Sequence, residues 1–300
     1  MPAISRGGHR LAYTMHNVAA VNLWQVPLAG RTRPAGPPVK LVASSRQQGR
    51  PSFSPDGRLA FNSDRSGSLE IWTSEANGSN ATALTAFGGP WTGSPRWSPD
   101  GRLIAFDSHG AEGSRIYIVR SDGGPVTPVA TGVDDSTMPA WSADGKWLYF
   151  GDRIEGVDQV FKVPVEGGKA TQLTTRGGSG PIVATSDGMR IYYTKQTAIC
   201  SVSTAGRDER CLSALPVLRP ELAASWALSP EGVYFIGADM RRPGIDFFEF
   251  ASGRIVRVVD LPGRPAPWGG PMALSPDGRR LLYSQADDIA SDIMLVNDFR

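Results

Sequence analysis

The chain has 300 residues, and its 31 lysine and arginine residues against 29 aspartate and glutamate residues give a formal net charge of +2. The charges form no basic run, which argues against nucleic-acid binding, and no apolar run is long enough to span a bilayer. We expect a soluble chain with no membrane segment. Its compartment, cytoplasmic or periplasmic, stays open because it depends on any further amino-terminal region.

The first predicted element is a degenerate unit, "ISRGGHRLAY" at residues 4–13, followed by a Pro/Gly-rich insertion at residues 29–40. From residue 53 onwards a turn of the Ser-Pro-Asp-Gly type recurs. Its acidic residue stands at Asp56, Asp100, Asp144, Asp187, Glu231 and Asp277, with spacings of 43 to 46 residues. Counting Gly7 as the marker of the degenerate unit, the sequence holds seven units of nearly one length.

Each unit predicts four short strands. An apolar or aromatic residue precedes the turn, and an apolar strand ending in Phe or Tyr follows it. A third strand comes next, as at residues 70–74, 115–119 and 159–163, and a Gly-containing turn leads to a fourth, as at 81–85 and 170–174. Four strands repeated every 40–45 residues are typical of propeller blades. In the turns, Pro presets φ and Gly supplies a positive φ, so we interpret the aspartates as structural.

We therefore predict an all-β fold, a seven-bladed β-propeller of four-stranded antiparallel blades in a single domain over residues 1–300. The predicted blades span about 2–44, 45–89, 90–134, 135–178, 179–220, 221–265 and 266–300. Only Met1 and Pro2 precede the first inner strand, too few to complete the last blade. We expect that blade to have three strands, the third at 292–296, and its bare edge leaves dimerisation as an alternative.

At these residues the chain resembles the TolB-like propeller repeats (PD40), relatives of the WD40 repeats. The second to fourth units match well, as in residues 94–108 with 115–129, whereas Gly7, Thr185 and Glu231 depart from the pattern. More narrowly, the chain is similar to the carboxy-terminal propeller of bacterial multidomain transcriptional regulators. That resemblance implies a sensory or protein-interaction module that forms the carboxy-terminal part of a larger protein. It implies no DNA binding by this part, because no winged helix is present.

The sequence offers few candidates for chemistry. His9, His16 and His109 have no metal-ligand spacing, and nucleophile-elbow, P-loop and dinucleotide motifs do not occur. We predict no catalytic residue, no metal and no cofactor. Cys200 and Cys211 are symmetric about Ala205–Gly206, so they should face each other across an antiparallel hairpin. A disulfide and a pair of reduced thiols both agree with that placement.

Loops between second and third strands and connectors between blades share one face with the central channel, and function commonly sits on such loops. We expect a protein or peptide partner, or a small ligand, to bind there. The candidate residues are Asp64, Arg65, Trp91, Asp107, His109, Asp152, Arg153, Asp239, Arg241, Arg242, Trp268, Asp287 and Asp288.

The sequence favours a non-enzymatic binding scaffold, because no catalytic constellation is recognisable. One alternative is a hydrolase or glycan-active propeller with acidic residues at the channel mouth, which needs two carboxylates ~5–10 Å apart. Another is a TolB-like periplasmic interaction protein. Clustered channel carboxylates would favour the enzyme, and an aromatic and polar face would favour the scaffold.

Overall fold

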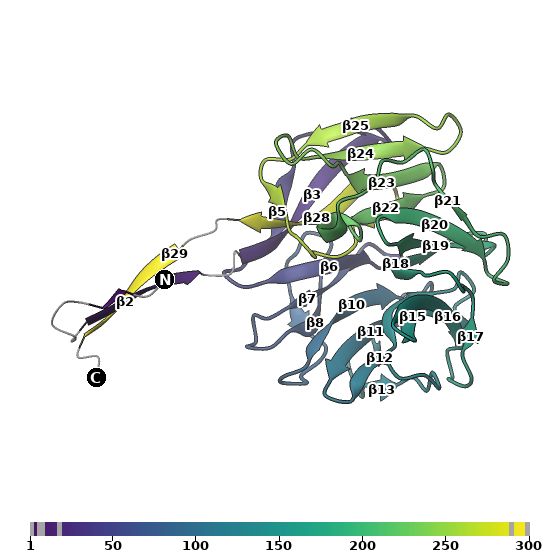
Figure 1. Cartoon of the computed structure of the whole chain (residues 1–300), viewed down its shortest axis with the longest axis horizontal. Helices are drawn as coiled ribbons and strands as arrows, with labels where there is room; N and C mark the ends of the chain where they lie inside the picture. Colours follow the sequence, from purple (N-terminus) through teal and green to yellow (C-terminus); the bar gives the residue numbers. More distant parts are fainter. Residues whose placement is uncertain (1–2, 5–9, 17–19, 288–290, 298–300) are drawn as a thin grey trace.

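The computed structural model describes the whole chain except residues 1–2, 5–9, 17–19, 288–290 and 298–300. Within the described residues, six antiparallel blades surround a central channel (Figure 1). In blades 1 to 5 the strands follow one another in chain order from the inner strand outwards. The molecule is thus an all-β propeller, as predicted, with six blades and not seven.

Blades 1 to 3 cover residues 48–172. Blade 1 consists of β6 (Gln48–Phe53), β7 (Leu59–Ser63), β8 (Glu70–Ser74) and β9 (Thr82–Ala83). Blade 2 consists of β10 (Trp91–Trp97), β11 (Leu103–Gly110), β12 (Gly113–Arg120) and β13 (Thr127–Pro128). Blade 3 consists of β14 (Thr137–Trp141), β15 (Trp147–Ile154), β16 (Val157–Pro164) and β17 (Thr171–Gln172).

Blades 4 and 5 follow directly. Blade 4 consists of β18 (Ser179–Ala184), β19 (Arg190–Lys195), β20 (Ala198–Ser203) and β21 (Arg210–Cys211). A short 3-10 helix, η1 (Pro220–Leu222), leads into blade 5. Blade 5 consists of β22 (Trp226–Ser229), β23 (Gly232–Ile236), β24 (Gly244–Glu249) and β25 (Ile255–Asp260).

Blade 6 is built from both ends of the chain. Its interrupted inner strand, β26 (Arg264–Pro265) and β27 (Ala273–Leu274), and its second strand, β28 (Arg280–Asp287), come from the carboxy-terminal part. Its third strand, β3 (Ala20–Gly30), and its interrupted outer strand, β4 (Arg33–Pro34) and β5 (Val39–Val42), come from the amino-terminal part. The pairing of β28 with β3 closes the ring.

This closure corrects two expectations from the sequence. The unit predicted over residues 2–44 is not a blade, because its third and fourth strands belong to blade 6. The last blade is not three-stranded, because those same strands complete it. The physical reason is that pairing β28 with β3 removes a sheet edge that a three-stranded blade would expose.

The remaining strands form a small sheet that stands apart from the ring (Figure 1). It has three strands, β1 (Ala3–Ile4), β2 (Arg10–His16) and β29 (Ser291–Asn297), in the order β1-β2-β29. Ala20 pairs with Asp287 in blade 6, and His16 pairs with Ser291 in the small sheet. His16 lies four residues before Ala20, and Ser291 lies four residues after Asp287. The pairing of β2 with β29 therefore has the same register as the pairing of β3 with β28. The predicted marker Gly7 lies outside the described residues.

The core lies between neighbouring blades. Blade 3 and blade 4 share one apolar cluster, in which Tyr149 and Val160 pack with Ile191 and Tyr193. Another cluster joins the two chain ends to blade 1, since Leu23 of β3 packs with Phe61 and Leu282. Because each blade buries its faces against its neighbours, no blade has a core of its own, which is the expected behaviour of a repeat architecture.

The recurring turns join the first and second strands of the blades. In blade 2, the Ser98 hydroxyl donates to Asp100 Oδ1 at 2.6 Å, and the backbone N–H of Arg102 donates to the same oxygen at 3.1 Å. Gly101 has a φ of +71°, which favours glycine. The corresponding hydroxyl-to-carboxylate bonds reach Asp56, Asp144, Asp187 and Asp277. These aspartates are turn residues.

The hydrogen bonds of these turn aspartates predict that the folded protein loses stability at low pH. The Ser98 hydroxyl holds the pKa of Asp100 below its usual value, and the equivalent bonds lower the pKa of the other four turn aspartates. A carboxyl whose pKa is lower in the folded than in the unfolded chain stabilises the fold above about pH 4–5 and loses that effect as the pH falls through its folded pKa. We expect the free energy of unfolding in urea to fall below about pH 4. The fall should be shallower for Ser98→Ala, and identical acid profiles would contradict the interpretation.

Candidate functional site

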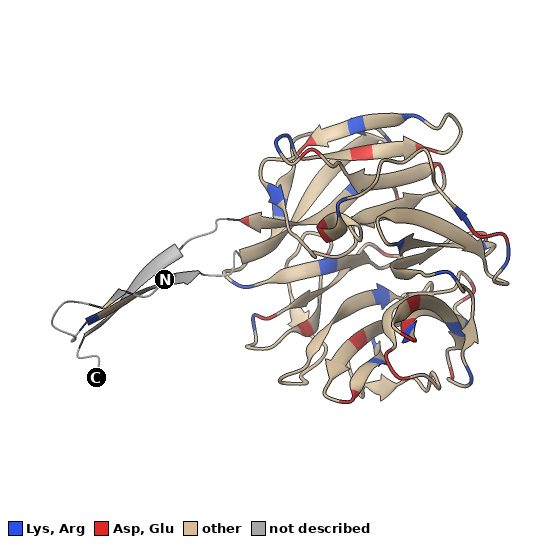
Figure 2. Cartoon of the chain, viewed as in Figure 1, with Lys and Arg blue, Asp and Glu red and all other residues tan. Residues whose placement is uncertain are grey.

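The two faces of the ring differ in what they carry. The connector face carries the loops between second and third strands and the connectors between blades, and the turn face carries the Ser-Pro-Asp-Gly turns. The strand order places the candidate residues of the sequence analysis on the connector face, at strand ends and loops. Asp288 lies outside the described residues. In Figure 2 the positions of Lys and Arg are interspersed with those of Asp and Glu along the strands and loops.

Trp91 and Trp268 line the same small cavity on the connector face. Its volume is about 100 Å³, and Arg50, Gln48 and Asn62 also contribute to its walls. Trp268, in the blade 6 connector, is 69% exposed, whereas Trp91, at the start of β10, is partly buried. Blades 1, 2 and 6 therefore meet at this cavity.

Trp91 is held between a cation and an imidazole. The Arg50 guanidinium lies 4.8 Å from the centre of the indole ring, a cation–π arrangement. The His109 ring approaches the indole edge-on, with 4.6 Å between ring centres. Arg50 also donates a hydrogen bond to Ser94 Oγ at 3.2 Å. The orientation of Trp91 is therefore fixed before any partner arrives.

Asp107 holds the ring of His109, the residue that contacts Trp91, in place. Its Oδ2 lies 3.1 Å from His109 Nε2 and accepts the backbone N–H of Met138 at 3.1 Å. The carboxylate is fully buried, and its Oδ1 has no hydrogen-bond partner among the described residues. A buried acceptor without a donor costs about 1–3 kcal/mol, so this oxygen is a feature that needs an explanation.

Ser114, His109 and Asp107 form a line of hydrogen bonds, because Ser114 Oγ lies 3.1 Å from His109 Nδ1. Such a line resembles the hydrolase constellation in residue types. The Ser114 side chain, however, is buried, with 5% of the residue exposed, so a substrate carbonyl cannot reach its hydroxyl. In this molecule the line fixes the ring of His109 against Trp91.

Most other candidate residues are engaged with neighbouring groups. Arg65 donates to Gln48 Oε1 at 2.6 Å, Arg153 to Asp158 at 2.8 Å and Arg242 to Asp260 at 2.7 Å. Asp287 forms an ion pair with Lys40, and the indole of Trp24 donates to it. The structure thus brings Trp91, Asp107, His109 and Trp268 to one region. Arg65, Arg153, Arg242 and Asp287 are each paired with other groups.

Asp152 of blade 3, one position further along its strand than Asp107 in blade 2, is also buried. It accepts the Asp135 N–H and the Ser136 hydroxyl, yet burial outweighs these bonds and raises its pKa. Among the described residues, no group of three or more His, Cys, Asp or Glu side chains could hold a metal ion.

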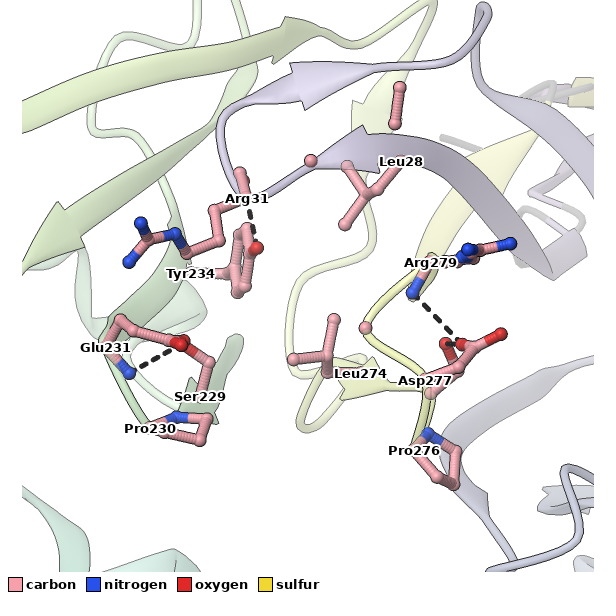
Figure 3. A pocket seen from close by; sticks show the side chains of 14 residues that line it. Leu28, Arg31, Ser229, Pro230, Glu231, Tyr234, Leu274, Pro276, Asp277 and Arg279 are labelled. Atoms are coloured by element: carbon pink, nitrogen blue, oxygen red, sulfur yellow. Dashed lines mark hydrogen bonds between the residues drawn. The ribbon is translucent and has the colours of Figure 1, made fainter.

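A larger cavity, of about 550 Å³, lies on the turn face between blades 5 and 6 (Figure 3). The Tyr234 hydroxyl donates to the Arg31 carbonyl at 2.9 Å, and Asp277 accepts the backbone N–H of Arg279 at 3.0 Å. These polar groups are already paired within the turns and the β3–β4 hairpin. We interpret this cavity as a junction between blades.

Cys200 pairs directly with Cys211 across β20 and β21, and a disulfide joins the two residues. Cys200 is fully buried in the cluster between blades 3 and 4, whereas Cys211 is exposed. Disulfides form and persist mainly in oxidising compartments. Separately, no helix in the described part of the chain has the length and apolar character needed to cross a membrane.

Residues 87–238 match the family model PD40, described as the TolB beta propeller domain, and this match covers just over half of the chain. The chain belongs to the TolB beta propeller domain (PD40) family. No curated protein matches the sequence significantly.

Solved structures share the architecture of this PD40 propeller. A protein assigned as TolB from Agrobacterium tumefaciens has a TM-score of 0.72 and 20% identity, over 90% of this chain and 99% of that one. TolB from Acinetobacter baumannii has a TM-score of 0.62 and 16% identity, over 92% of this chain and 66% of that one. A chain of a nidogen/laminin complex has a TM-score of 0.63 and 11% identity, over 88% and 97%. At these identities the likeness shows the fold alone.

Sequence reasoning missed two arginines of the PD40 propeller. Arg50 stands before Pro51 in β6, and Arg96 follows Pro95 in β10. Arg50, Ser94 and Met138 occupy the position before proline in blades 1 to 3, each with a φ near +50° that is uncommon for such residues. The signal was present in the repeat, because the variable residues beside its proline lie on the inner strands that line the channel.

Proposed function

We propose that this PD40 propeller is a non-enzymatic binding scaffold that recognises a protein or peptide partner on its connector face. The observation that carries the proposal is the meeting of Trp91, Trp268 and Arg50 at one cavity where three blades join. Trp and Arg dominate the binding energy of many protein interfaces, because their large side chains bury much surface and keep a polar end. The fixed orientation of Trp91 also lowers the entropic cost of binding.

We further propose that the propeller works as the carboxy-terminal part of a larger bacterial regulator, in which it senses or docks a partner. The support for this setting is the sequence resemblance to such regulators. The near-equal numbers of 31 Lys and Arg and 29 Asp and Glu residues, whose positions are interspersed in Figure 2, are in keeping with recognition of a protein rather than of nucleic acid.

The test is recovery of a partner from a lysate of the source bacterium. Tagged wild-type protein and the double variant Trp91→Ala with Trp268→Ala are used as baits, and bound proteins are identified by mass spectrometry. We expect recovery of a specific partner to fall at least tenfold with the double variant, since hot-spot residues contribute about 2 kcal/mol or more each.

A matched control places the same kind of change on the turn face. Met189 directly follows one of the turns, and Trp147 stands two residues after another. The variant Trp147→Ala with Met189→Ala should recover the partner like the wild type. Equal losses with both double variants, or unchanged recovery with the first, would contradict the proposal.

A second candidate function is that of a TolB-like periplasmic interaction protein. The Cys200–Cys211 disulfide favours it, because an oxidising compartment would preserve the bond. Fractionation of cells combined with thiol labelling of Cys211 distinguishes the two settings. Reduced thiols in a cytoplasmic fraction favour the regulator, and a disulfide in a periplasmic fraction favours the second candidate.

A further inference from the structure

Two arginine side chains without ion pairs reach the inner part of the channel. Arg50 comes from β6 of blade 1 and Arg96 from β10 of blade 2. Within the described part of the chain, no carboxylate oxygen lies within 4.0 Å of either guanidinium. Each side chain has one hydrogen bond, from Arg50 to Ser94 Oγ at 3.2 Å and from Arg96 to the Pro95 carbonyl at 2.8 Å. A guanidinium has five N–H donors, so most donors of both remain for a bound group.

The charges around these arginines are incompletely balanced. Both side chains are partly accessible to solvent yet lie deep in the ring, surrounded by blades. Burial and, to a smaller extent, the positive charge of Arg50 together lower the pKa of Arg96 to about 10, although the negative charge of Asp107 opposes both effects. Asp107 also acts on Arg50, and it is already shared with His109 and the N–H of Met138. Asp107 is therefore the one carboxylate that is seen to act on both guanidinium groups among the described residues, and it forms an ion pair with neither.

The size of the cavity limits what that anion can be. The space beside Arg50 is about 100 Å³, room for roughly three water molecules of ~30 Å³ each. Sites for drug-sized ligands and cofactors have about 300–1,000 Å³. A carboxylate on a short stem is therefore of the right size to fill this space. The indole rings of Trp91 and Trp268 provide apolar walls for the methylene groups of the stem.

We propose that this cavity binds the side-chain carboxylate of an aspartate or glutamate that a protein partner presents, with Arg50 as its anchor and the positive charge of Arg96, which does not line the cavity, adding attraction. The proposal rests on the proposed function, because it names the chemistry by which the partner is recognised. Arginine suits this role because it can hold a carboxylate with two parallel hydrogen bonds.

The test uses small probes and the indole N–H signals of the folded protein in NMR spectra. The probes are N-acetylglutamate N-methylamide, its neutral glutamine counterpart, N-acetylglycine and inorganic phosphate, all at equal ionic strength. We expect the Trp91 signal, assigned with Trp91→Phe, to shift saturably with the glutamate probe and little with the glutamine probe. Equal shifts with the two amide probes, or no shift with the glutamate probe, overturn the proposal. Tighter binding of N-acetylglycine or phosphate overturns the assignment to an acidic side chain.

Substitutions distinguish a specific role of Arg50 from a general effect of positive charge on the connector face. Arg50→Gln should weaken binding of the glutamate probe at least tenfold, and Arg50→Lys should weaken it less. The control is Arg153→Gln, which removes an exposed arginine of the same face that pairs with Asp158. An equal loss with Arg153→Gln overturns the proposal. If Arg50→Gln does not fold, Arg96→Gln should weaken the probe severalfold, and wild-type binding by Arg96→Gln then overturns the proposal.

The proposed scaffold function and the proposed carboxylate site can be contradicted independently. If the glutamate probe does not bind while partner recovery still depends on Trp91 and Trp268, the carboxylate site is wrong and the scaffold function stands. If the probe binds through Arg50 while partner recovery is indifferent to both tryptophans, the carboxylate site stands and the scaffold function is wrong.

Discussion

A chain that begins at residue 43 lacks β3, β4 and β5 of blade 6 together with β1 and β2 of the small sheet, and it should lose cooperative thermal unfolding and associate in a concentration-dependent way. Without β3, the second strand of blade 6, β28, has an exposed edge, and exposed edges pair with other chains. The cluster that joins blade 6 to blade 1 also loses the buried side chains of Leu23 and Val42. Circular dichroism during heating and light scattering after gel filtration measure both effects.

The control for this truncation removes only the small sheet. A chain of residues 17–290 lacks β1, β2 and β29 but keeps all six blades, and it should unfold like the full chain. The point substitution Leu23→Ala probes the same core more gently and should cost about 2–5 kcal/mol in the free energy of unfolding. A chain from residue 43 that melts cooperatively as a monomer would show that the ring does not depend on its amino-terminal strands.

The variant Trp226→Ala should lower the free energy of unfolding by about 3–5 kcal/mol. Trp226 is fully buried between blades 4 and 5, and its indole N–H donates to Thr194 Oγ1 at 3.0 Å. It occupies the position that proline holds in the inner strands of blades 1 to 3, and β22 pairs with β23 without a bulge. Removing it creates a cavity and leaves the Thr194 hydroxyl without its donor.

The matched control is the same substitution at an exposed tryptophan. Trp268→Ala should change the free energy of unfolding by no more than about 0.5 kcal/mol, because surface residues contribute little to stability. Urea denaturation of both variants measures the difference. If the two substitutions cost the same, Trp226 is not a core residue of the blade 4–5 junction.

The candidate site could be predicted only in part from the sequence. Trp91, Trp268, Asp107 and His109 could be assigned to one face because strand order in a four-stranded blade fixes which loops share a face. Their mutual contacts could not, because Trp268 comes from a connector about 180 residues further along the chain than Trp91. Arg50 and Arg96 could not be recognised from the recurring turn alone, because that turn defines each unit and the residues beside the inner-strand proline vary from unit to unit.

The sequence by itself determined the blade, because the turn residues, the apolar alternation and the near-constant spacing are local properties of each unit. It also determined that Cys200 and Cys211 stand opposite each other, since both lie on one hairpin. Only the tertiary structure decided the number of blades. A repeat shows which segments can form strands, but it does not show which strands pair. By the repeat alone, β28 could pair with β3 of the amino-terminal part, or with β29 in a three-stranded last blade. That choice depends on which arrangement leaves fewer backbone groups unpaired around the whole ring.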